Sequence, residues 1–280
     1  MKQQVLELNI NNVPSSLNLS AIGCYIQDGK ELVEIKEYID KKAKPRPLEP
    51  TQLRFELKEA TPEVIDLSNL SPVRMKTLDN LFQNTYNLKK ITGTKHFTQE
   101  NVKNIGSLRS MFYAARSLED DGGLLDLHYT ITQEYGIDSI FYECSLPVQS
   151  LANITYSDSL TKLRFGQVFR FTKATTVDLS NQDLYSLQQR LGSGFNCTSS
   201  FDYSSSVINV ITNEKTILPD VDLSFSWSKM TKQSALNIFN ALPTSTRGSV
   251  LRINNGNWYK ELTDEEKLIP VNKGWTFQRG

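Results

Sequence analysis

A short motif that alternates apolar and polar residues occurs four times along the chain. Each copy is an apolar residue, an aspartate and a leucine, centred on Asp66, Asp126, Asp178 and Asp222, and three of the four copies continue with serine. Alternation places successive side chains on opposite faces of a strand, so that one face is buried and the other is exposed. The motif therefore predicts four short strands.

A second motif places phenylalanine at a regular spacing. Phe82, Phe112 and Phe141 lie 30 and 29 residues apart, and each follows an apolar residue. Ahead of the first of them, residues 73–80 place apolar side chains two or three positions apart, close to the spacing of a helix or a single turn. One strand and one short helix cannot bury their own apolar faces, whereas stacked copies share a core in which each phenylalanine fills the same slot. The sequence thus predicts stacked units, each a strand followed by a short helix or turn.

The first fifty residues follow a different pattern. Residues 5–10 alternate like a strand, and residues 22–26 and 32–35 flank Asp28-Gly29, a dipeptide typical of hairpin turns. Residues 41–50 contain three prolines and four basic side chains, which excludes a regular helix or a central strand. The basic residues could contact phosphate, but a solvated linker or irregular entry loop is the preferred interpretation. We therefore expect residues 1–52 to form a β-rich N-terminal attachment segment with a proline-rich linker.

The C-terminal residues predict a unit that closes the stack. Residues 230–242 have the apolar spacing of a helix, which Thr231 can cap and Pro243 can end. A strand at 250–253 follows, then a second helix that begins after Thr263 with three acidic residues in its first turn, where the helix dipole favours them. A final strand at 273–277 ends the unit. Open stacks need a distinct terminal unit, and we assign that role to about residues 223–280.

These patterns together predict an α/β solenoid, a leucine-rich-repeat-like stack of short strands and short helices over residues 53–280, with a small β-rich N-terminal segment. Residues 107–118 and 177–181 resemble the BspA-type leucine-rich repeat, in which a methionine–phenylalanine pair precedes small residues, a leucine and a strand with Asp-Leu-Ser. Residues 223–277, above all 229–238, 262–267 and 273–276, resemble the closing segment of such arrays. The resemblance covers roughly residues 60–280. Residues 208–220 fit it poorly, and Pro270 departs from it, so the last helix is expected to stop early there.

The resemblance implies binding or architecture without catalysis. Arrays of this type occur on bacterial and protist surfaces and among phage structural proteins, and the closing segment here is most similar to the phage and prophage copies. The first hypothesis is therefore a phage virion component, tail-associated or capsid-associated, whose N-terminal segment docks to other virion proteins. Its array would bind a host-surface protein or glycan. The alternative is a bacterial surface or secreted adhesin of the BspA type.

Composition limits the classes of partner that the chain is expected to bind. The chain has 31 basic and 31 acidic side chains and no formal net charge, so bulk charge gives no attraction to nucleic acid or to an anionic membrane. No apolar run approaches the ~20 residues that span a bilayer, and none follows Lys2 as in a secretory signal. We therefore predict neither nucleic-acid binding nor membrane insertion. Cys24, Cys144 and Cys197 are few and scattered, which indicates reduced, buried thiols.

Candidate chemistry is sparse. His96 and His128 lack a neighbouring nucleophile motif or metal-ligand spacing, so structural roles are favoured. The acidic residues 119–121 precede two glycines and suit a turn better than a calcium loop, which needs oxygens at alternate positions. Residues 192–194 are too short a glycine motif to cradle phosphate. A glycan hydrolase would need paired carboxylates, and no pair is distinguished. We predict no catalytic, cofactor-binding or metal-binding residues, no cofactor and no enzyme activity.

Aromatic residues are the strongest candidates for contact with a partner. Tyrosine and tryptophan bury much area at little entropic cost and are common at binding hot spots. The residues singled out on this ground are Tyr113, Tyr142, Tyr156, Tyr185, Tyr203, Trp227, Trp258 and Tyr259. Most of them are also expected to complete the core, so the sequence leaves the partner-binding residues open.

Overall fold

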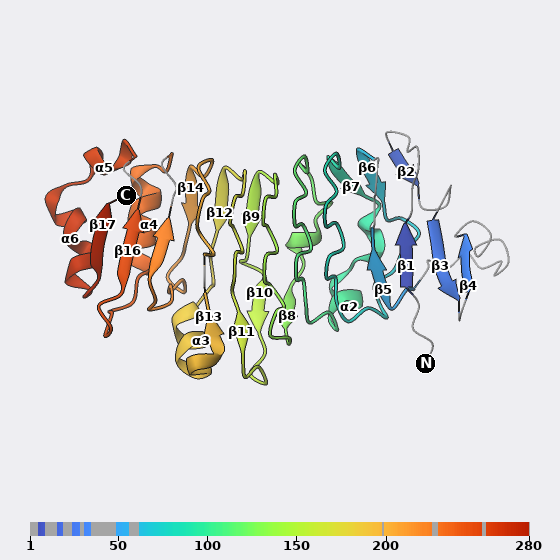
Figure 1. Cartoon of the computed structure of the whole chain (residues 1–280), viewed down its shortest axis with the longest axis horizontal. Helices are drawn as coiled ribbons and strands as arrows, with labels where there is room; N and C mark the ends of the chain where they lie inside the picture. The colour runs from blue at the N-terminus through green and yellow to red at the C-terminus, as the bar shows by residue number, and fades with distance from the viewer. Residues whose placement is uncertain are drawn as a thin grey trace.

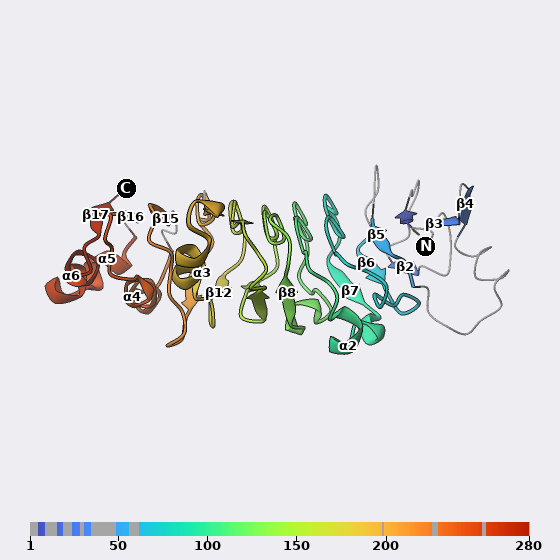
Figure 2. The same ribbon diagram turned by 90° about the horizontal axis from the view of Figure 1, so that it is seen from below.

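The protein, seen in a computed structural model, is elongated, with its two termini towards opposite ends of the long axis (Figure 1). The structure describes residues 5–8, 16–18, 24–28, 31–34, 49–55, 62–197, 199–225, 229–253 and 256–279. Its strands follow one another along the long axis in both views (Figures 1 and 2). Helices α4 (Lys232–Ala241), α5 (Trp258–Glu261) and α6 (Asp264–Asn272) gather at the C-terminal end, and α3 (Leu184–Leu191) projects from one side.

The N-terminal strands form one mixed sheet in the order β4-β3-β1-β5. These strands are β1 (Val5–Leu8), β3 (Cys24–Asp28), β4 (Glu31–Glu34) and β5 (Gln52–Arg54). The predicted hairpin is confirmed, because β3 and β4 pair antiparallel with Asp28 opposite Glu31. Strand β5 includes residue 52 and pairs parallel with β1. Most of the predicted linker at 41–50 lies outside the described residues.

The remaining strands are short and pair in parallel. Three sheets have three strands each: β2 (Ser16–Asn18), β6 (Val64–Asp66) and β7 (Lys90–Thr92); β9 (Val148–Ser150), β12 (Thr176–Asp178) and β14 (Asn209–Ile211); and β15 (Leu223–Phe225), β16 (Val250–Ile253) and β17 (Thr276–Arg279). Two sheets have two strands each: β8 (Tyr129–Ile131) with β10 (Ile154–Tyr156), and β11 (Leu163–Arg164) with β13 (Phe195–Asn196). Each pair joins segments distant in sequence, as where Ile65 lies opposite Ile91.

Three of the four Asp-Leu motifs lie at strands, as predicted, but the one at Asp126 does not. Residues Leu124–Asp126 form a 3-10 helix. The reason is local hydrogen bonding, because the Asp121 carboxylate accepts the backbone N–H groups of Gly123 and Leu125. A backbone group held by a side chain in this way is not free to join a ladder. The 3-10 turn therefore replaces the predicted strand.

Between the strands, where the sequence predicts a short helix or a turn, the described residues form five turn segments. They are residues 78–86, 108–116, 137–145, 165–173 and 199–205. In the first, the N–H groups of Asn80, Phe82 and Asn84 donate to carbonyls of the second segment, and that of Leu78 donates to the Ser107 carbonyl just before it, at N···O distances of 2.8–2.9 Å. The residues between them bond within the segment, as from Gln83 N–H to Asn80 C=O. The same alternation links the later segments, so each segment is held by its neighbour rather than by helical hydrogen bonds.

The predicted fold class is therefore wrong. An α/β solenoid of leucine-rich-repeat type would alternate a strand with a short helix, whereas the described residues form six small, mostly parallel sheets and few helices. Ahead of α4, the described helices are η1 (Thr94–His96), α2 (Gln99–Val102), η2 (Leu124–Asp126), α3 (Leu184–Leu191) and η3 (Gly192–Gly194). Residues at positive φ explain the difference, because two in each turn segment, such as Asn80 at 59° and Asn84 at 61°, break any helix.

A column of stacked phenylalanine rings forms the centre of the core. The rings, in contact order, are Phe55, Phe82, Phe112, Phe141, Phe169, Phe201 and Phe225, with centroid separations between 4.8 and 6.1 Å. All seven side chains are almost completely buried. The prediction that the regularly spaced phenylalanines fill equivalent places is confirmed. Offset stacking adds to the free energy that burial of such rings supplies.

The C-terminal elements agree with the sequence prediction except at Pro270. Helix α4 (Lys232–Ala241) begins after Thr231, whose side chain accepts the Ser234 N–H. After the short α5 (Trp258–Glu261), helix α6 (Asp264–Asn272) begins after Thr263 with a capping box. Contrary to the prediction, α6 continues through Pro270. The Pro270 carbonyl accepts the N–H of Trp275, which turns the chain into β17.

Lysine 273 joins α6 to α4. Lys273 Nζ donates to the carbonyls of Phe239, Asn240 and Leu242, at 3.1, 2.7 and 2.7 Å. The last carbonyls of a helix lack partners within the helix and carry the negative end of its dipole. An ammonium group is the matching partner for them. The two helices are thus held together by a polar cap as well as by apolar packing.

A second polar link between these helices predicts a pH-dependent stability. The hydrogen bond from Lys232, together with the Thr263 N–H, lowers the pKa of the Glu266 carboxyl. Because its pKa is lower in the folded state, this pair stabilises the fold at neutral pH, and the contribution is lost as pH falls through the folded pKa. We expect Glu266→Gln to lower Tm at about pH 7 and to have less effect as the pH is lowered towards about 2, because the carboxyl becomes protonated once the pH falls through its folded-state pKa.

Asp264→Asn is the matched control, because Asp264 forms an exposed pair with Lys267 on the same helix. Exposed pairs contribute little to stability. Thermal unfolding of both variants across this pH range measures the effect. Equal pH profiles for the two variants would show that the Lys232–Glu266 link adds nothing specific.

Candidate binding surface

Outward-facing side chains of the turn segments form the candidate site. Counting from Leu78 as the first residue of a segment, the fifth residue is the buried phenylalanine, and the sixth, seventh and ninth carry side chains that are partly or fully exposed in most segments. We call the aromatic and charged residues among them the aromatic–cationic strip. It comprises Tyr86, Tyr113, Arg116, Tyr142, Glu143, Arg170, Phe171, Lys173, Asp202 and Tyr203.

The rings of this strip contact one another from segment to segment. Tyr113 and Tyr142 stack at 4.6 Å between centroids, and Phe171 and Tyr203 stack at 5.2 Å. Between the two pairs, Tyr142 meets Phe171 edge to face at 84°. The strip therefore consists of two stacked pairs with a change of ring orientation between them. Burial and the neighbouring Tyr142 raise the pKa of Tyr113, so its hydroxyl stays protonated at neutral pH.

Arginine side chains lie against these rings. The Arg116 guanidinium lies 4.9 Å from the centroid of Tyr86 and is hydrogen-bonded to Glu143, with Nε 2.8 Å from Oε2. Arg170 lies over both Phe171 and Tyr203, at 5.0 and 5.3 Å. Its Nε is buried and has no hydrogen-bond partner among the described residues. Cations over aromatic faces gain about 0.5–1 kcal/mol at exposed sites, which fixes the rings in place.

The backbone under the second ring pair is strained. Phe171 and Tyr203 lie at φ values of 57° and 59°, yet 37% and 58% of their surfaces are exposed. The first segment has Asn84 at the equivalent place, a residue type that tolerates this conformation. A bulky side chain there costs about 1–2 kcal/mol. Because two residues of every turn segment have a positive φ, this conformation belongs to the fold, and what distinguishes the pair is that two large exposed rings occupy such positions.

A hollow opens beside this pair. Arg116, Glu143, Phe171 and Lys173 line it, and its volume is about 380 Å³. We call it the Lys173 hollow. It combines an apolar wall from Phe171, one ion pair and one further cation. Such a lining can hold a small group that is partly apolar and carries a negative charge.

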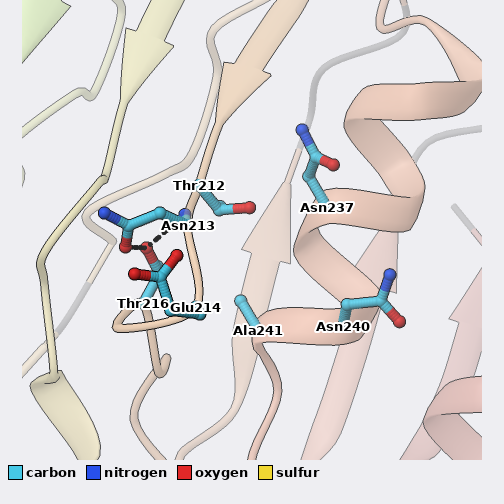
Figure 3. A pocket seen from close by; sticks show the side chains of 7 residues that line it. All are labelled: Thr212, Asn213, Glu214, Thr216, Asn237, Asn240 and Ala241. Carbon is cyan, nitrogen blue, oxygen red and sulfur yellow. Dashed lines mark hydrogen bonds between the residues drawn. The ribbon is translucent and has the colours of Figure 1, made fainter.

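A second hollow, of about 340 Å³, lies between the loop after β14 and helix α4 (Figure 3). Its lining is polar, with Thr212, Glu214, Asn237 and Asn240 among the contributors. Several of its groups already have partners, since the Asn237 amide donates to the Val210 carbonyl. Asn213 and Thr216 are hydrogen-bonded to each other, as the dashed lines in Figure 3 show. This hollow lacks an aromatic wall.

A third cluster lies near the start of the turn segments. The Tyr135 ring has guanidinium groups on it from Arg109 and Arg164, at 5.2 and 5.8 Å. Arg164 Nε lies 3.2 Å from Asp138 Oδ1 without hydrogen-bond geometry. Burial raises the pKa of Asp138, and the two arginines oppose that rise. The close approach depends on Gly166, because a Cβ there would lie 2.5 Å from Asp138 Oδ1.

The structure separates the other residues that the sequence singled out. His96 ends η1, and His128 precedes β8 with its N–H bonded to the Gln99 side chain. Burial raises the pKa of the Cys144 thiol and that of the Cys197 thiol, each to about 12, and both cysteines are free. Cys24 belongs to β3, and its side chain lies outside the described residues.

The carboxylates of Asp120 and Asp121 accept hydrogen bonds from backbone N–H groups of their own turn. Asp120 accepts the N–H of Gly122, and Asp121 those of Gly123 and Leu125. A hydrogen bond from Lys90 lowers the pKa of Asp120, whereas burial raises that of Asp121. Within the described part of the chain, no three His, Cys, Asp or Glu side chains are grouped so as to hold a metal ion. No helix described there is long and apolar enough to cross a membrane.

Comparison with known proteins gives no relative. The chain matches no protein-family model, no curated protein and no solved structure. The similarity of residues 60–280 to BspA-type arrays therefore remains a prediction from the sequence. Any function must therefore be inferred from the geometry of the strip itself.

The sequence found part of this strip. Tyr113, Tyr142 and Tyr203 were among the aromatic residues singled out, but Phe171, Arg116, Arg170 and Lys173 were not. A signal for them existed, because all four follow a stacked phenylalanine by one to four positions. That signal becomes useful only once the turn segments are known to share one alignment.

Proposed function

We propose that this chain is a non-enzymatic interaction protein that binds a partner through the aromatic–cationic strip. We further propose that it works as a phage virion component, tail-associated or capsid-associated. Its partners would be other virion proteins at the N-terminal segment and a host-surface protein or glycan at the strip.

One observation carries the binding proposal. The strip exposes Phe171 and Tyr203 at strained backbone positions and stacks Arg170 on both rings. Tyrosine, other aromatics and arginine are the residue types enriched at interface hot spots. The hydrogen bonds between segments hold these side chains on a stiff backbone, so little conformational entropy is lost when a partner binds.

The virion setting rests on a different observation, the resemblance of residues 223–277 to the closing segment of phage-type arrays. It is tested separately, by mass spectrometry of purified particles. We expect the chain to co-purify with the particles at a fixed ratio to other structural proteins. Its absence from particles would exclude the virion setting, and recovery from the cell surface instead would favour the adhesin alternative.

Binding through the strip is tested with Tyr203→Asn in the full chain. We expect this variant to bind host cells at least about tenfold more weakly, because truncation of a hot-spot residue typically costs 2 kcal/mol or more. The variant should fold, since asparagine occupies the equivalent place at Asn84. Leu268→Gln is the control, because Leu268 is an exposed apolar residue on α6, at the far C-terminal end. Unchanged binding by Tyr203→Asn would exclude the strip as the contact surface.

A further inference from the structure

We infer that the Lys173 hollow binds a carboxylate-bearing sugar residue, so that the ligand of the strip is an acidic glycan. This inference rests on the proposed binding function and names the ligand class for it. It is argued from the size of the hollow, its charge and the side chain that forms its apolar wall.

The size of the hollow suits one sugar residue or two. Its volume of about 380 Å³ lies at the lower end of the range for small-molecule sites, about 300–1,000 Å³. A protein partner, by contrast, covers about 800 Å² on each side of a stable interface. The feature that distinguishes this part of the surface is a hollow rather than a broad flat area. A small projecting group is therefore favoured over a protein surface.

The charge of the hollow favours an anion. Arg116 is already engaged by Glu143, with which it forms a two-nitrogen contact. Lys173 is exposed and forms no ion pair with another described residue. The lining thus has one positive charge in excess. A single ligand carboxylate would neutralise it, and a hydrogen bond to a charged partner contributes about 1.5–3 kcal/mol.

The apolar wall favours a sugar ring over a simple anion. Phe171 contributes to the lining and is 37% exposed, a large fraction for a phenylalanine. The negative face of an aromatic ring attracts weakly polarised C–H groups, which line one side of many sugar rings. Arg170 and Tyr203 pack against the Phe171 ring, so it does not need to be ordered on binding. A carboxylate on a pyranose ring engages Lys173 and Phe171 together.

The test compares a charged ligand with its uncharged twin. Oligogalacturonate and its methyl ester have the same rings, and only the first carries carboxylates. Titration calorimetry with the full chain is expected to show binding of oligogalacturonate, at least about tenfold weaker binding of the ester, and a loss of affinity as salt increases. A panel of other uronic-acid and sialic-acid oligosaccharides, each with its neutral counterpart, covers the remaining members of the class.

Two variants locate the contact. Lys173→Gln should reduce affinity for the acid at least about tenfold and leave the weak binding of the ester unchanged, because it removes only the charge. Phe171→Asn should weaken binding of both ligands, and it should fold because asparagine is accepted at the equivalent place, Asn84. Leu268→Gln should bind like the unaltered chain. Circular dichroism of each variant checks that it is folded.

Several results would overturn the inference. They are equal affinity for acid and ester, unchanged binding by Lys173→Gln, absence of binding to every acidic sugar of the panel, or tighter binding of an oligoglutamate peptide than of any sugar. The last result would identify an acidic protein partner. If Tyr203→Asn still abolishes attachment to host cells in that case, only the ligand class is wrong and the binding function stands.

Discussion

Replacement of Phe112 by alanine is expected to lower the free energy of unfolding by about 3–5 kcal/mol. The Phe112 side chain is completely buried, and it stacks between Phe82 and Phe141 at centroid distances of 5.7 and 6.1 Å. Truncation leaves a cavity between two rings that cannot approach each other, because hydrogen bonds between the turn segments fix their spacing. The lost burial and the cavity therefore both contribute to the cost.

Chemical denaturation measured by fluorescence or circular dichroism gives the change in stability. Tyr86→Ala is the control, because Tyr86 is another aromatic residue of a turn segment but is 46% exposed. Its replacement should cost less than about 1 kcal/mol. If Phe112→Ala cost no more than Tyr86→Ala, the stack would not be the centre of the core.

Replacement of Gly93 by alanine is expected to be nearly as damaging, at about 3 kcal/mol or more. Gly93 has a φ of 69°, and a Cβ there would lie 1.9 Å from Asp66 Oδ1 and 2.4 Å from the Ser68 backbone nitrogen. Asp66 is not free to move aside, because its carboxylate accepts the N–H and the hydroxyl of Ser68. The neighbouring backbone must therefore shift.

Gly248→Ala provides a matched comparison. Gly248 has the same positive φ, 69°, but a Cβ there would meet nothing within 4 Å. It should cost only about 1 kcal/mol, the conformational penalty alone. The difference between the two variants in thermal or chemical unfolding isolates the close contact between neighbouring parts of the chain. Equal costs would mean that backbone conformation accounts for both.

The sequence predicted the right core residues but did not decide between a short helix and a turn for the segments between the strands. In the second segment Leu108, Met111, Phe112 and Ala115 are buried, which are the first, fourth, fifth and eighth residues. An amphipathic helix buries the same positions. The spacing alone therefore does not distinguish a helix from this series of turns. The residues at positive φ do, but serine and alanine at Ser110 and Ala114 carry no turn signal.

Elements with a specific local signal were predicted well. Thr231 and Thr263 mark the starts of α4 and α6, and Asp28-Gly29 marks the hairpin between β3 and β4. Capping residues and turn dipeptides act through hydrogen bonds between residues close in the sequence, so their effect can be predicted without the tertiary structure. The prediction that the last helix stops at Pro270 was wrong for the opposite reason, because tertiary contacts around α6 outweigh the helix-breaking tendency of proline.

The candidate site was less predictable than the fold. Lys173 and Arg116 are ordinary surface cations in the sequence, and they line one hollow only because three successive turn segments lie side by side. Glu143 neutralises one of them and leaves the other. Their relation thus depends on the alignment of the turn segments, which no short motif specifies.

The alternation of hydrogen bonds in the turn segments restricts where insertions and deletions can occur. In each segment, alternate N–H groups bond to the neighbouring segment and the others bond within the turn. Loss of one residue inside a segment would shift this alternation by one position, so that each later N–H group would face the wrong kind of partner. It would also move the phenylalanine out of the column. Connections outside the segments carry no such restriction, and their lengths already differ. Phe141 and Phe169 are 28 residues apart, whereas Phe169 and Phe201 are 32 residues apart, yet both pairs stack. We expect natural variants to differ in length in these connections, such as the longer one that contains α3 and η3, while the turn segments keep theirs.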